Sequence, residues 1–256
     1  MIVVAILAKD KEYCLPFYLT CLLKQTVKKK DIALYIRTND NKDNTEAILK
    51  NFIDMYGNEY ASVYYDDSSI DDTLTQYDEH EWNSHRFLIL GKIRQDSIDY
   101  ANTMGADYFT ADCDNFIGPS TLKDMQGDKV VGPMLSLLPT PSYASFHYKA
   151  CPLGYYEDTP QQNMIQQGEI KGIIEVDTVH CTYFIPHHIL KEVSYYDGTE
   201  RYEYAIFSDN LRRKKIPQYI DNRDFYGFLY LNDQITIGFP NFIKNYWYDQ
   251  YTRFIR

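Results

Sequence analysis

The chain has 256 residues, 45% of them hydrophobic and 24% charged, a composition that is typical of a globular protein and excludes a largely disordered one. This length suits one large α/β domain with a substantial core. Asp and Glu total 36 against 26 Lys and Arg, so the formal charge of −10 repels a phosphate backbone and argues against nucleic acid as a partner.

Strand-like and helix-like patterns alternate through the first half of the chain. Strand-like apolar runs lie at IVVAILA (2–8), IALYIRT (32–38), ASVYYDD (61–67) and ADYFTAD (106–112). Helical patterns lie between them, at LPFYLTCLLKQ (15–25), NTEAILKNFIDMYG (44–57) and residues 84–104. This β-α-β-α-β-α-β order predicts an α/β fold with a mostly parallel, nucleotide-binding type of sheet flanked by helices.

The helix expected at residues 44–57 has a clear apolar stripe. Its apolar residues recur at three- and four-residue spacing, which predicts that one face packs on the sheet. These residues are Ile48, Leu49, Phe52, Ile53 and Tyr56. Gly57 follows at the position where a glycine commonly ends a helix.

The strand at 106–112 runs directly into Asp112, Cys113 and Asp114. In an extended backbone Asp112 and Asp114 point the same way, while Cys113 points back into the protein. Two adjacent carboxylates repel each other unless a cation, a proton or water compensates them. Carboxylate oxygens suit Mn²⁺ or Mg²⁺, and such an ion on a diphosphate neutralises the charge of a departing nucleotide. The tripeptide alone is a weak signal, because Asp is common in turns.

Other polar residues also follow predicted strands. In open α/β sheets, ligands collect at the carboxyl ends of the strands. Residues 8–10, 38–40 and 112–114 all lie at such ends. The sequence contains neither GxGxxG nor GxxxxGK[ST], so neither a dinucleotide site nor a P-loop is expected.

Several motifs occur in a characteristic order. AILAKDKEYCLPFYL, DNTEAIL, EWNSHRF, GADYFTADCDNFI, VVGPML, VHCTYFIP, FSDN and DNRDFYGF follow one another over about residues 2–230. In this order and spacing the chain resembles the collagen β-galactosyltransferase family. The resemblance implies a single GT-A-type domain over residues 1–256, with a nucleotide-binding half at 1–118, a smaller mixed acceptor-side half at 119–230 and an aromatic C-terminal tail at 231–256.

The resemblance also implies an activity. It indicates a metal-dependent, inverting transfer of a hexose from a UDP-sugar to hydroxylysine of a collagen-like protein. The implied cofactor is Mn²⁺, with Mg²⁺ as the alternative. Galactose is the first donor sugar to expect, followed by glucose or an N-acetylhexosamine.

Three acidic residues match the metal ligands that the resemblance implies. Asp112 and Asp114 match the family's D-x-D motif, with Asp114 chiefly on the metal and Asp112 on metal or ribose. Near the domain's end the family has a His in an N-x-H-x-Y-G pattern, and NRDFYG places Asp224 there as a third ligand. The alternative is that Asp224 ends a strand in a turn.

The resemblance also identifies a candidate catalytic base. An inverting transfer needs a carboxylate that takes a proton from the acceptor hydroxyl. FSDN resembles a family F-D-D segment at the start of a helix, which makes Asp209 the candidate, with Ser208 in place of the first acid. Either residue could instead cap the N-terminus of that helix.

Donor contacts are expected at the strand ends and at other positions that match the family. Trp82 and Arg86 could stack on and neutralise the donor, although Trp82 could instead pack under a loop. His180, in VHCT, could bond a donor hydroxyl or be a core histidine. The full set of expected donor contacts is Ala8, Thr38, Asp40, Trp82, Arg86, Asp112 and His180.

Alternatives of other kinds stay open. The acceptor could be a polysaccharide or a lipid-linked glycan, or the chain could be a binding homologue that has lost catalysis.

The cysteines and the N-terminus bear on where the protein acts. The five cysteines include no CxxC pair. The apolar run at 2–8 is too short for a membrane span and lacks a basic leader. We therefore expect no transmembrane segment and a microbial or viral protein acting in the cytoplasm. The aromatic tail could pack on the sheet or form a homo-oligomer interface.

Overall fold

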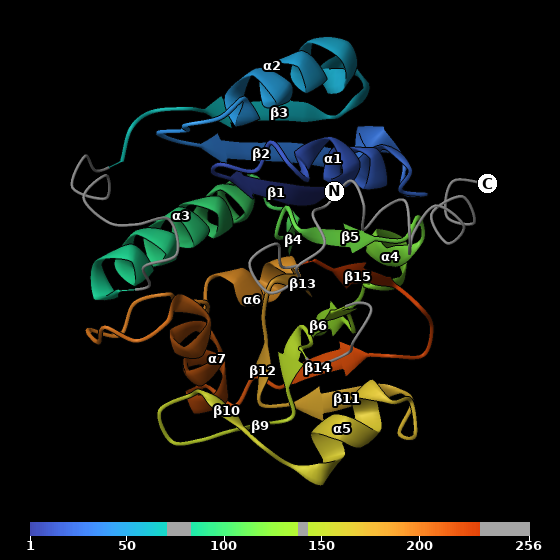
Figure 1. The fold of residues 1–256 in the computed structure, drawn as a ribbon, viewed down its shortest axis with the longest axis vertical. Coiled ribbons are helices and arrows are strands. Elements are labelled where there is room, and N and C mark those ends of the chain that lie inside the picture. Colours follow the sequence, from blue (N-terminus) through green and yellow to red (C-terminus); the bar gives the residue numbers. More distant parts are fainter. Residues whose placement is uncertain (71–82, 138–142, 231–256) are drawn as a thin grey trace.

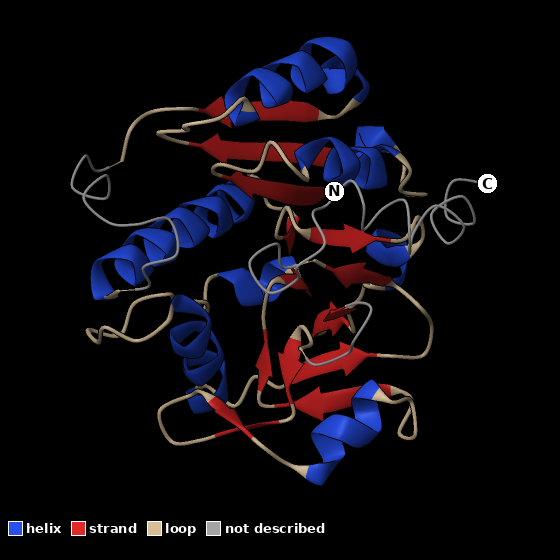
Figure 2. Cartoon of the chain, in the orientation of Figure 1, coloured by secondary structure: helices blue, strands red, loops and turns tan. Residues whose placement is uncertain are grey.

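The computed structural model describes residues 1–70, 83–137 and 143–230, in which helices cover both faces of one large sheet (Figures 1 and 2). Eight strands form this sheet. In spatial order they are β11 (Ile173–Val176), β14 (Gln218–Asp221), β6 (Val130–Pro133), β13 (Thr182–Ile185), β4 (Asp107–Ala111), β1 (Ile2–Ala8), β2 (Ile32–Thr38) and β3 (Ser62–Asp66).

The large sheet is parallel on one side and mixed on the other. Strands β4, β1, β2 and β3 are all parallel. The mixed region begins at β13, which pairs antiparallel with both β4 and β6, and β11 pairs antiparallel with β14. The nucleotide-binding type of sheet is thus confined to the N-terminal part of the fold.

Alternate residues of the central strands enter two separate cores. In β1, Ile2, Val4 and Ile6 pack in the core that contains residues of α1 and α2, while Val3 and Ala5 pack in the core that contains residues of α3 and α7.

Within the described part of the chain, none of the helices is long and apolar enough to cross a membrane. The helices are α1 (Leu15–Leu23), α2 (Thr45–Tyr56), α3 (Ser84–Thr103), α4 (Thr121–Asp124), α5 (Pro160–Gln166), α6 (His187–Leu190) and α7 (Glu203–Arg213), with short 3₁₀ turns η1 (Lys29–Asp31) and η2 (Gly57–Glu59).

Helix α2 confirms the predicted apolar stripe. Leu49 and Phe52 are buried in the core, and Ile48, Ile53 and Tyr56 pack against it. Gly57 follows the helix as expected, but its φ of −57° is right-handed and the chain continues into η2. The left-handed conformation that favours glycine at helix ends is therefore not used here.

Three smaller sheets surround the large one. Among the described residues, the stretch from 136 to 168 contributes short strands to these sheets and also contains α5. The strands of the small sheets are β5 (Asn115–Ile117), β15 (Gly227–Leu229) and β7 (Ser136–Leu137), then β8 (Phe146–His147) with β12 (Thr178–Val179), and β9 (Lys149–Ala150) with β10 (Tyr156–Glu157).

The pairing of β15 with β5 depends on a glycine. A Cβ on Gly227, whose φ is 139°, would lie 2.1 Å from the carbonyl oxygen of Phe116. We predict that Gly227→Ala pushes β15 off β5 and lowers the free energy of unfolding by about 3 kcal/mol or more. Chemical denaturation measures this loss. Gly127→Ala is the control, because among the described residues no atom lies within 4 Å of its added Cβ. Equal losses in the two variants would contradict the prediction.

Candidate active site

The carboxyl ends of β1, β2 and β4 lie side by side. Ala8 is the register partner of Thr38, and Asp112 follows the last residue of β4. The loops after β1 and β2 hold each other: the backbone N–H of Lys42 donates to Asp10 at 2.6 Å, and that of Asp10 donates to Asn41 at 2.9 Å. The structure therefore brings the expected donor residues Ala8, Thr38 and Asp112 to one edge.

Asp40 lies at the same edge in a left-handed backbone conformation, with φ of 46°. Its carboxylate accepts from the side-chain amide of Asn39 at 3.0 Å. Burial opposes the ionised form, but hydrogen bonds from Asn39 and neighbouring groups outweigh it and lower the pKa of Asp40. The group is thus an anion near the place where a nucleotide is expected.

The D-x-D motif forms a turn between β4 and β5. The N–H of Asn115 donates to the carbonyl of Asp112 at 2.8 Å, so the extended alternation stops at Ala111. Cys113 points inward as expected and is 1% exposed. The two carboxylates have separate cationic partners: Arg94 Nη2 lies 2.8 Å from Asp112, and Lys11 Nζ lies 2.8 Å from Asp114.

These cations are themselves largely buried. Burial opposes the charge of Lys11, but Asp114 outweighs it and raises the pKa of Lys11 well above its ordinary value. Burial likewise opposes the charge of Arg94, whose pKa is nevertheless raised by Asp112 and other nearby groups. Both side chains therefore stay protonated, and they supply the compensation that the carboxylate pair requires.

Glu203 is a further site residue that the sequence did not reveal. Its Oε1 lies 3.4 Å from Nε of Arg94, which joins Glu203 and Asp112 through one guanidinium. Burial raises the pKa of Glu203, although the charge of Arg94 opposes this shift. In the sequence, Glu203 resembles any acid in the first turn of a helix, and Arg94 any polar residue of a long one. Only the fold brings them together.

His180 lies in a strained turn next to the D-x-D motif. Cys181 has φ of 64°, and the N–H of Thr182 donates to the carbonyl of His180 at 2.7 Å, which forms a γ-turn. The carbonyl of Cys181 accepts from the N–H of Asp112 at 2.9 Å. His180 therefore lies between strands β12 and β13, and the strained turn is hydrogen-bonded directly to the backbone of Asp112.

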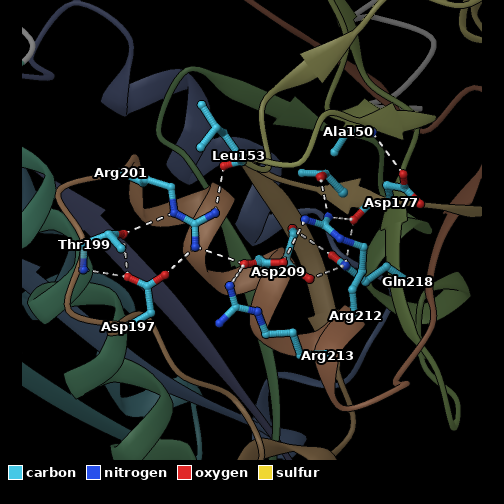
Figure 3. A network of polar contacts seen from close by, with 12 residues as sticks. Ala150, Leu153, Asp177, Asp197, Thr199, Arg201, Asp209, Arg212, Arg213 and Gln218 are labelled. Carbon is cyan, nitrogen blue, oxygen red and sulfur yellow. Dashed lines mark hydrogen bonds and ion pairs between the residues drawn. The ribbon is translucent and has the colours of Figure 1, made fainter.

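Asp209 is bound by arginines in the middle of α7 (Figure 3). Nη2 atoms of Arg201, Arg212 and Arg213 lie 3.0, 3.5 and 2.8 Å from its oxygens. The suggested helix start at FSDN is wrong, because α7 begins at Glu203 with Tyr202 as its N-cap. Asp209 and Ser208 are therefore interior residues of the helix and not its cap.

The arginines extend this network to other segments (Figure 3). Arg201 donates to the carbonyl of Leu153 at 2.7 Å and pairs with Asp197. Arg212 donates to the carbonyl of Asp177 at 2.5 Å. Asp209 thus anchors the cations that tie α7 to the surrounding loops, which is a structural role.

Asp224 is not brought together with the D-x-D motif. Strand β15 runs antiparallel to β5, so the residues before β15 meet the far end of β5. The N–H of Tyr230, which follows β15, donates to the carbonyl of Asp114 at 2.9 Å. Among the residues described, no three His, Cys, Asp or Glu side chains form a group that could hold a metal ion.

Arg86 lies near the start of α3. The N–H of Arg86 donates to the side chain of Asn83, the N-cap of α3, at 3.0 Å. Arg86 precedes Arg94 by eight residues, roughly 12 Å along a helix axis. Trp82 and the aromatic tail at 231–256 lie outside the described residues.

Sequence comparison gives matches over most of the chain. The model of the glycosyltransferase family 25 N-terminal domain matches residues 1–237. Procollagen galactosyltransferase 2 of Homo sapiens is 29% identical over 244 residues, 89% of this chain and 38% of the relative. Procollagen galactosyltransferase 1-B of Xenopus laevis is 27% identical over 240 residues, 89% of this chain and 39% of the relative. The chain thus spans 38–39% of the length of these two relatives.

Another relative is named as inactive. Inactive glycosyltransferase 25 family member 3 of Homo sapiens is 31% identical over 190 residues, which is 71% of this chain and 31% of the relative.

Structural comparison finds other glycosyltransferases. TarS 1–349 of S. aureus in complex with UDP-GlcNAc has a TM-score of 0.58 at 15% identity, covering 93% of this chain and 60% of that one. Mannosyltransferase PcManGT of Pyrobaculum calidifontis in complex with GDP-Man and Mn²⁺ has a TM-score of 0.52 at 10% identity, covering 90% and 56%. These likenesses confirm the expected GT-A-type fold.

A histidine beside His180 makes stability depend on pH. His147, in β8, is 7% exposed, and its ring centroid lies 4.9 Å from that of His180. Burial, helped by the charge of Arg212, lowers the pKa of His147 from 6.5 to about 4. The unfolded chain therefore takes up this proton at a higher pH than the folded protein does.

We predict that stability is full above pH 6.5 and falls as the pH drops towards 4, with about 3 kcal/mol due to His147. Denaturation curves over this range should show a smaller loss for His147→Gln than for the unchanged protein. His188→Gln, an exposed histidine of α6, is the control and should keep the full pH dependence. Parallel pH profiles for His147→Gln and the unchanged protein would contradict the assignment.

Proposed function

Because the chain belongs to glycosyltransferase family 25, we propose that it transfers a hexose from a UDP-sugar to hydroxylysine of a collagen-like protein, with inversion and with a divalent metal ion. Galactose is the first donor to test, then glucose and N-acetylhexosamines. The names of the curated relatives support the donor and the acceptor class. The UDP-GlcNAc in one structural relative supports a nucleotide-sugar donor.

The observation that carries this proposal is the charged cluster of Lys11, Arg94, Asp112, Asp114 and Glu203. It combines cations and carboxylates at the strand ends where open α/β sheets bind nucleotides. Arg94 and Lys11 would attract a diphosphate. Ala8, Thr38 and Asp40 line the same edge and would contact the nucleoside.

The carboxylates of Asp112 and Asp114 are chemically suited to Mn²⁺ or Mg²⁺. Such ions are commonly held by one or two carboxylates together with substrate phosphates, so a third protein acid is not required. A bound ion would neutralise the charge that builds on the leaving UDP. Lys11 pairs with Oδ2 of Asp114, so a metal ion at that oxygen would compete with its ammonium group.

Glu203 is the base that the geometry favours over Asp209. Its carboxylate lies within the charged cluster, and its raised pKa makes it a stronger proton acceptor than an exposed Glu. Asp209 is held by three guanidinium groups in a separate network. We therefore assign proton abstraction from the acceptor hydroxyl to Glu203.

A non-catalytic binding role is the second candidate function, because one relative of 31% identity is named as inactive. A measurement of turnover distinguishes the transferase from the non-catalytic binding role. We would measure UDP release from UDP-galactose, UDP-glucose and UDP-GlcNAc, with and without a hydroxylysine-containing collagen-like peptide. Release that the peptide accelerates supports the transferase. Binding of a UDP-sugar without any release supports the binding role.

For the base, we predict that Glu203→Gln lowers kcat by about 10²- to 10⁴-fold and changes UDP affinity far less, because Asp112 still pairs with Arg94. Activity should rise with pH through the raised pKa of Glu203, because the base must be ionised. Asp209→Asn is the matched variant and should lower stability more than kcat. If Asp209→Asn abolishes turnover in a folded protein while Glu203→Gln does not, Asp209 is the base and this assignment is wrong.

For the metal, we predict that EDTA abolishes turnover and that Asp114→Asn does the same. Lys11→Met should lower the Mn²⁺ concentration needed for half-maximal activity, because the ion no longer competes with an ammonium group for Asp114. Lys50→Met, which removes an exposed lysine of α2, is the control and should not change this concentration. Turnover that EDTA leaves unchanged would show that the cations of the protein suffice without metal.

A further inference from the structure

The loop after β1 and the loop that joins β2 to α2 are held together by hydrogen bonds that run in both directions. Asp10 accepts from the backbone N–H of Lys42 at 2.6 Å, and its own N–H donates to the side chain of Asn41 at 2.9 Å. Glu12 accepts from the side-chain amide and the backbone N–H of Asn44 at 2.8 and 3.0 Å. We call this set of contacts the loop clasp, and its members are Asp10, Lys11, Glu12, Asn41, Lys42, Asp43, Asn44 and Thr45.

Lys11 belongs to the loop clasp, and both polar groups of its backbone are fixed. Its N–H donates to the hydroxyl of Thr45, the first residue of α2, at 2.6 Å. Its carbonyl accepts from the N–H groups of Cys14 and Leu15 at 3.1 and 2.9 Å, where α1 begins. The backbone from which the ammonium group reaches Asp114 is therefore tied to the starts of two helices.

The start of α2 uses its side chains on the loop that carries Lys11. Thr45 is 0% exposed, and buried hydroxyl groups in native proteins are hydrogen-bonded; here the partner is the N–H of Lys11. Asn44, the N-cap of α2, does not cap the helix with its side chain and bonds Glu12 instead. Asp10 has φ of 51°, a left-handed conformation that is uncommon for residues other than glycine. The clasp therefore holds the loop after β1 in a specific conformation.

The loop clasp also connects two parts of the candidate active site. Asn41 joins it to the end of β2, because its side-chain amide donates to the hydroxyl of Thr38 at 2.6 Å. At the other end, Nζ of Lys11 lies 2.8 Å from Oδ2 of Asp114 and 3.4 Å from the hydroxyl of Tyr13. The end of β2 is thus linked through Asn41 and the loop backbone to the cation on Asp114.

We propose that the loop clasp, through the hydroxyl of Thr45, positions Lys11 against Asp114 and so sets the balance between a divalent ion and a diphosphate at this site. In the clasped position the ammonium group pairs with Oδ2 of Asp114, which opposes a metal ion there, and offers a positive charge to a diphosphate. Thr45 is a positioning residue, because it acts through Lys11. This inference rests on the proposed function for the identity of the two ligands.

The test is Thr45→Val, which keeps the shape of the side chain and removes the hydroxyl that holds Lys11. We expect it to bind Mn²⁺ about three- to tenfold more tightly and UDP in EDTA about three- to tenfold more weakly, as for the loss of one hydrogen bond or ion pair. Calorimetry measures both affinities without turnover. The opposite signs are diagnostic, because general damage to the site would weaken both ligands.

Two controls separate positioning from a merely structural role. Thr45→Ser keeps the hydroxyl and should restore both affinities. Thr121→Val changes another threonine of 0% exposure at the first position of a helix, α4, whose hydroxyl donates to the carbonyl of Tyr226 at 2.8 Å. It loses a comparable hydrogen bond outside the clasp and should leave both affinities unchanged. If Thr45→Val does not fold, Asn44→Ala, an exposed and uncharged change within the clasp, should shift the affinities in the same directions.

A double variant with Lys11→Met tests whether Thr45 acts through Lys11. If it does, adding Thr45→Val to Lys11→Met changes neither affinity further. A full additional effect in the Lys11→Met background would overturn the inference. So would a Thr45→Val protein that binds both ligands as Thr121→Val does, or that binds both more weakly.

Failure of the proposed function gives a different result. If the unchanged protein binds neither Mn²⁺ nor UDP, the transferase proposal falls, and the free energies of unfolding of Thr45→Val, Lys11→Met and the double variant decide the positioning of Lys11. A combined loss smaller than the sum of the single losses supports the inference, because the hydroxyl and the ion pair to Asp114 then act as one unit. Additive losses would contradict it. If only one of the two ligands binds, that affinity and this cycle decide.

Discussion

The arrangement of this site depends on cations that neutralise two adjacent carboxylates. Asp112 and Asp114 are joined by one residue in a turn, and their repulsion requires opposite charge close by. Arg94, from α3, and Lys11, from the loop after β1, each pair with one of them at 2.8 Å. The turn, the helix and the loop are thus fixed relative to one another by charge. These pairs therefore hold in place the edge of the sheet at which β1 and β4 end.

Arg94 extends this constraint across the molecule. Its guanidinium contacts Asp112 on one side and Glu203 on the other, so it links the end of β4 to the start of α7. A buried guanidinium without a carboxylate partner is costly, and Arg94 has two such partners. One side chain therefore positions both Asp112, which we propose as a metal ligand, and Glu203, which we propose as the base. Changing either acid alters the environment of the other.

Lys11 neutralises the second carboxylate of the motif. An ammonium group already neutralises Asp114, so the carboxylate pair does not need a metal ion for the fold to be stable. The divalent ion that we propose would compete with this lysine at Oδ2 of Asp114. The family includes relatives named as galactosyltransferases and relatives named as inactive. Membership of this family does not by itself establish activity.

The sequence by itself determined the order of the elements in the first half of the chain, the apolar stripe of α2 and the place of the D-x-D motif at the end of a strand. Periods of two and of about three and a half residues are local, so they can be read along the chain. The resemblance of its motifs likewise identified the family. These features are fixed by neighbours in sequence and need no knowledge of distant contacts.

Only the tertiary structure decided which charged side chains meet. Nothing local distinguishes Arg94 or Glu203 from other polar residues of their helices, and their pairing spans more than 100 positions. The antiparallel direction of β15 sends Asp224 away from Asp114, and Arg201, which precedes α7, joins Asp209 to the carbonyl of Leu153. Ion pairs and strand directions between distant segments leave no periodic trace in a sequence. The partners of each functional group therefore became known only from the fold.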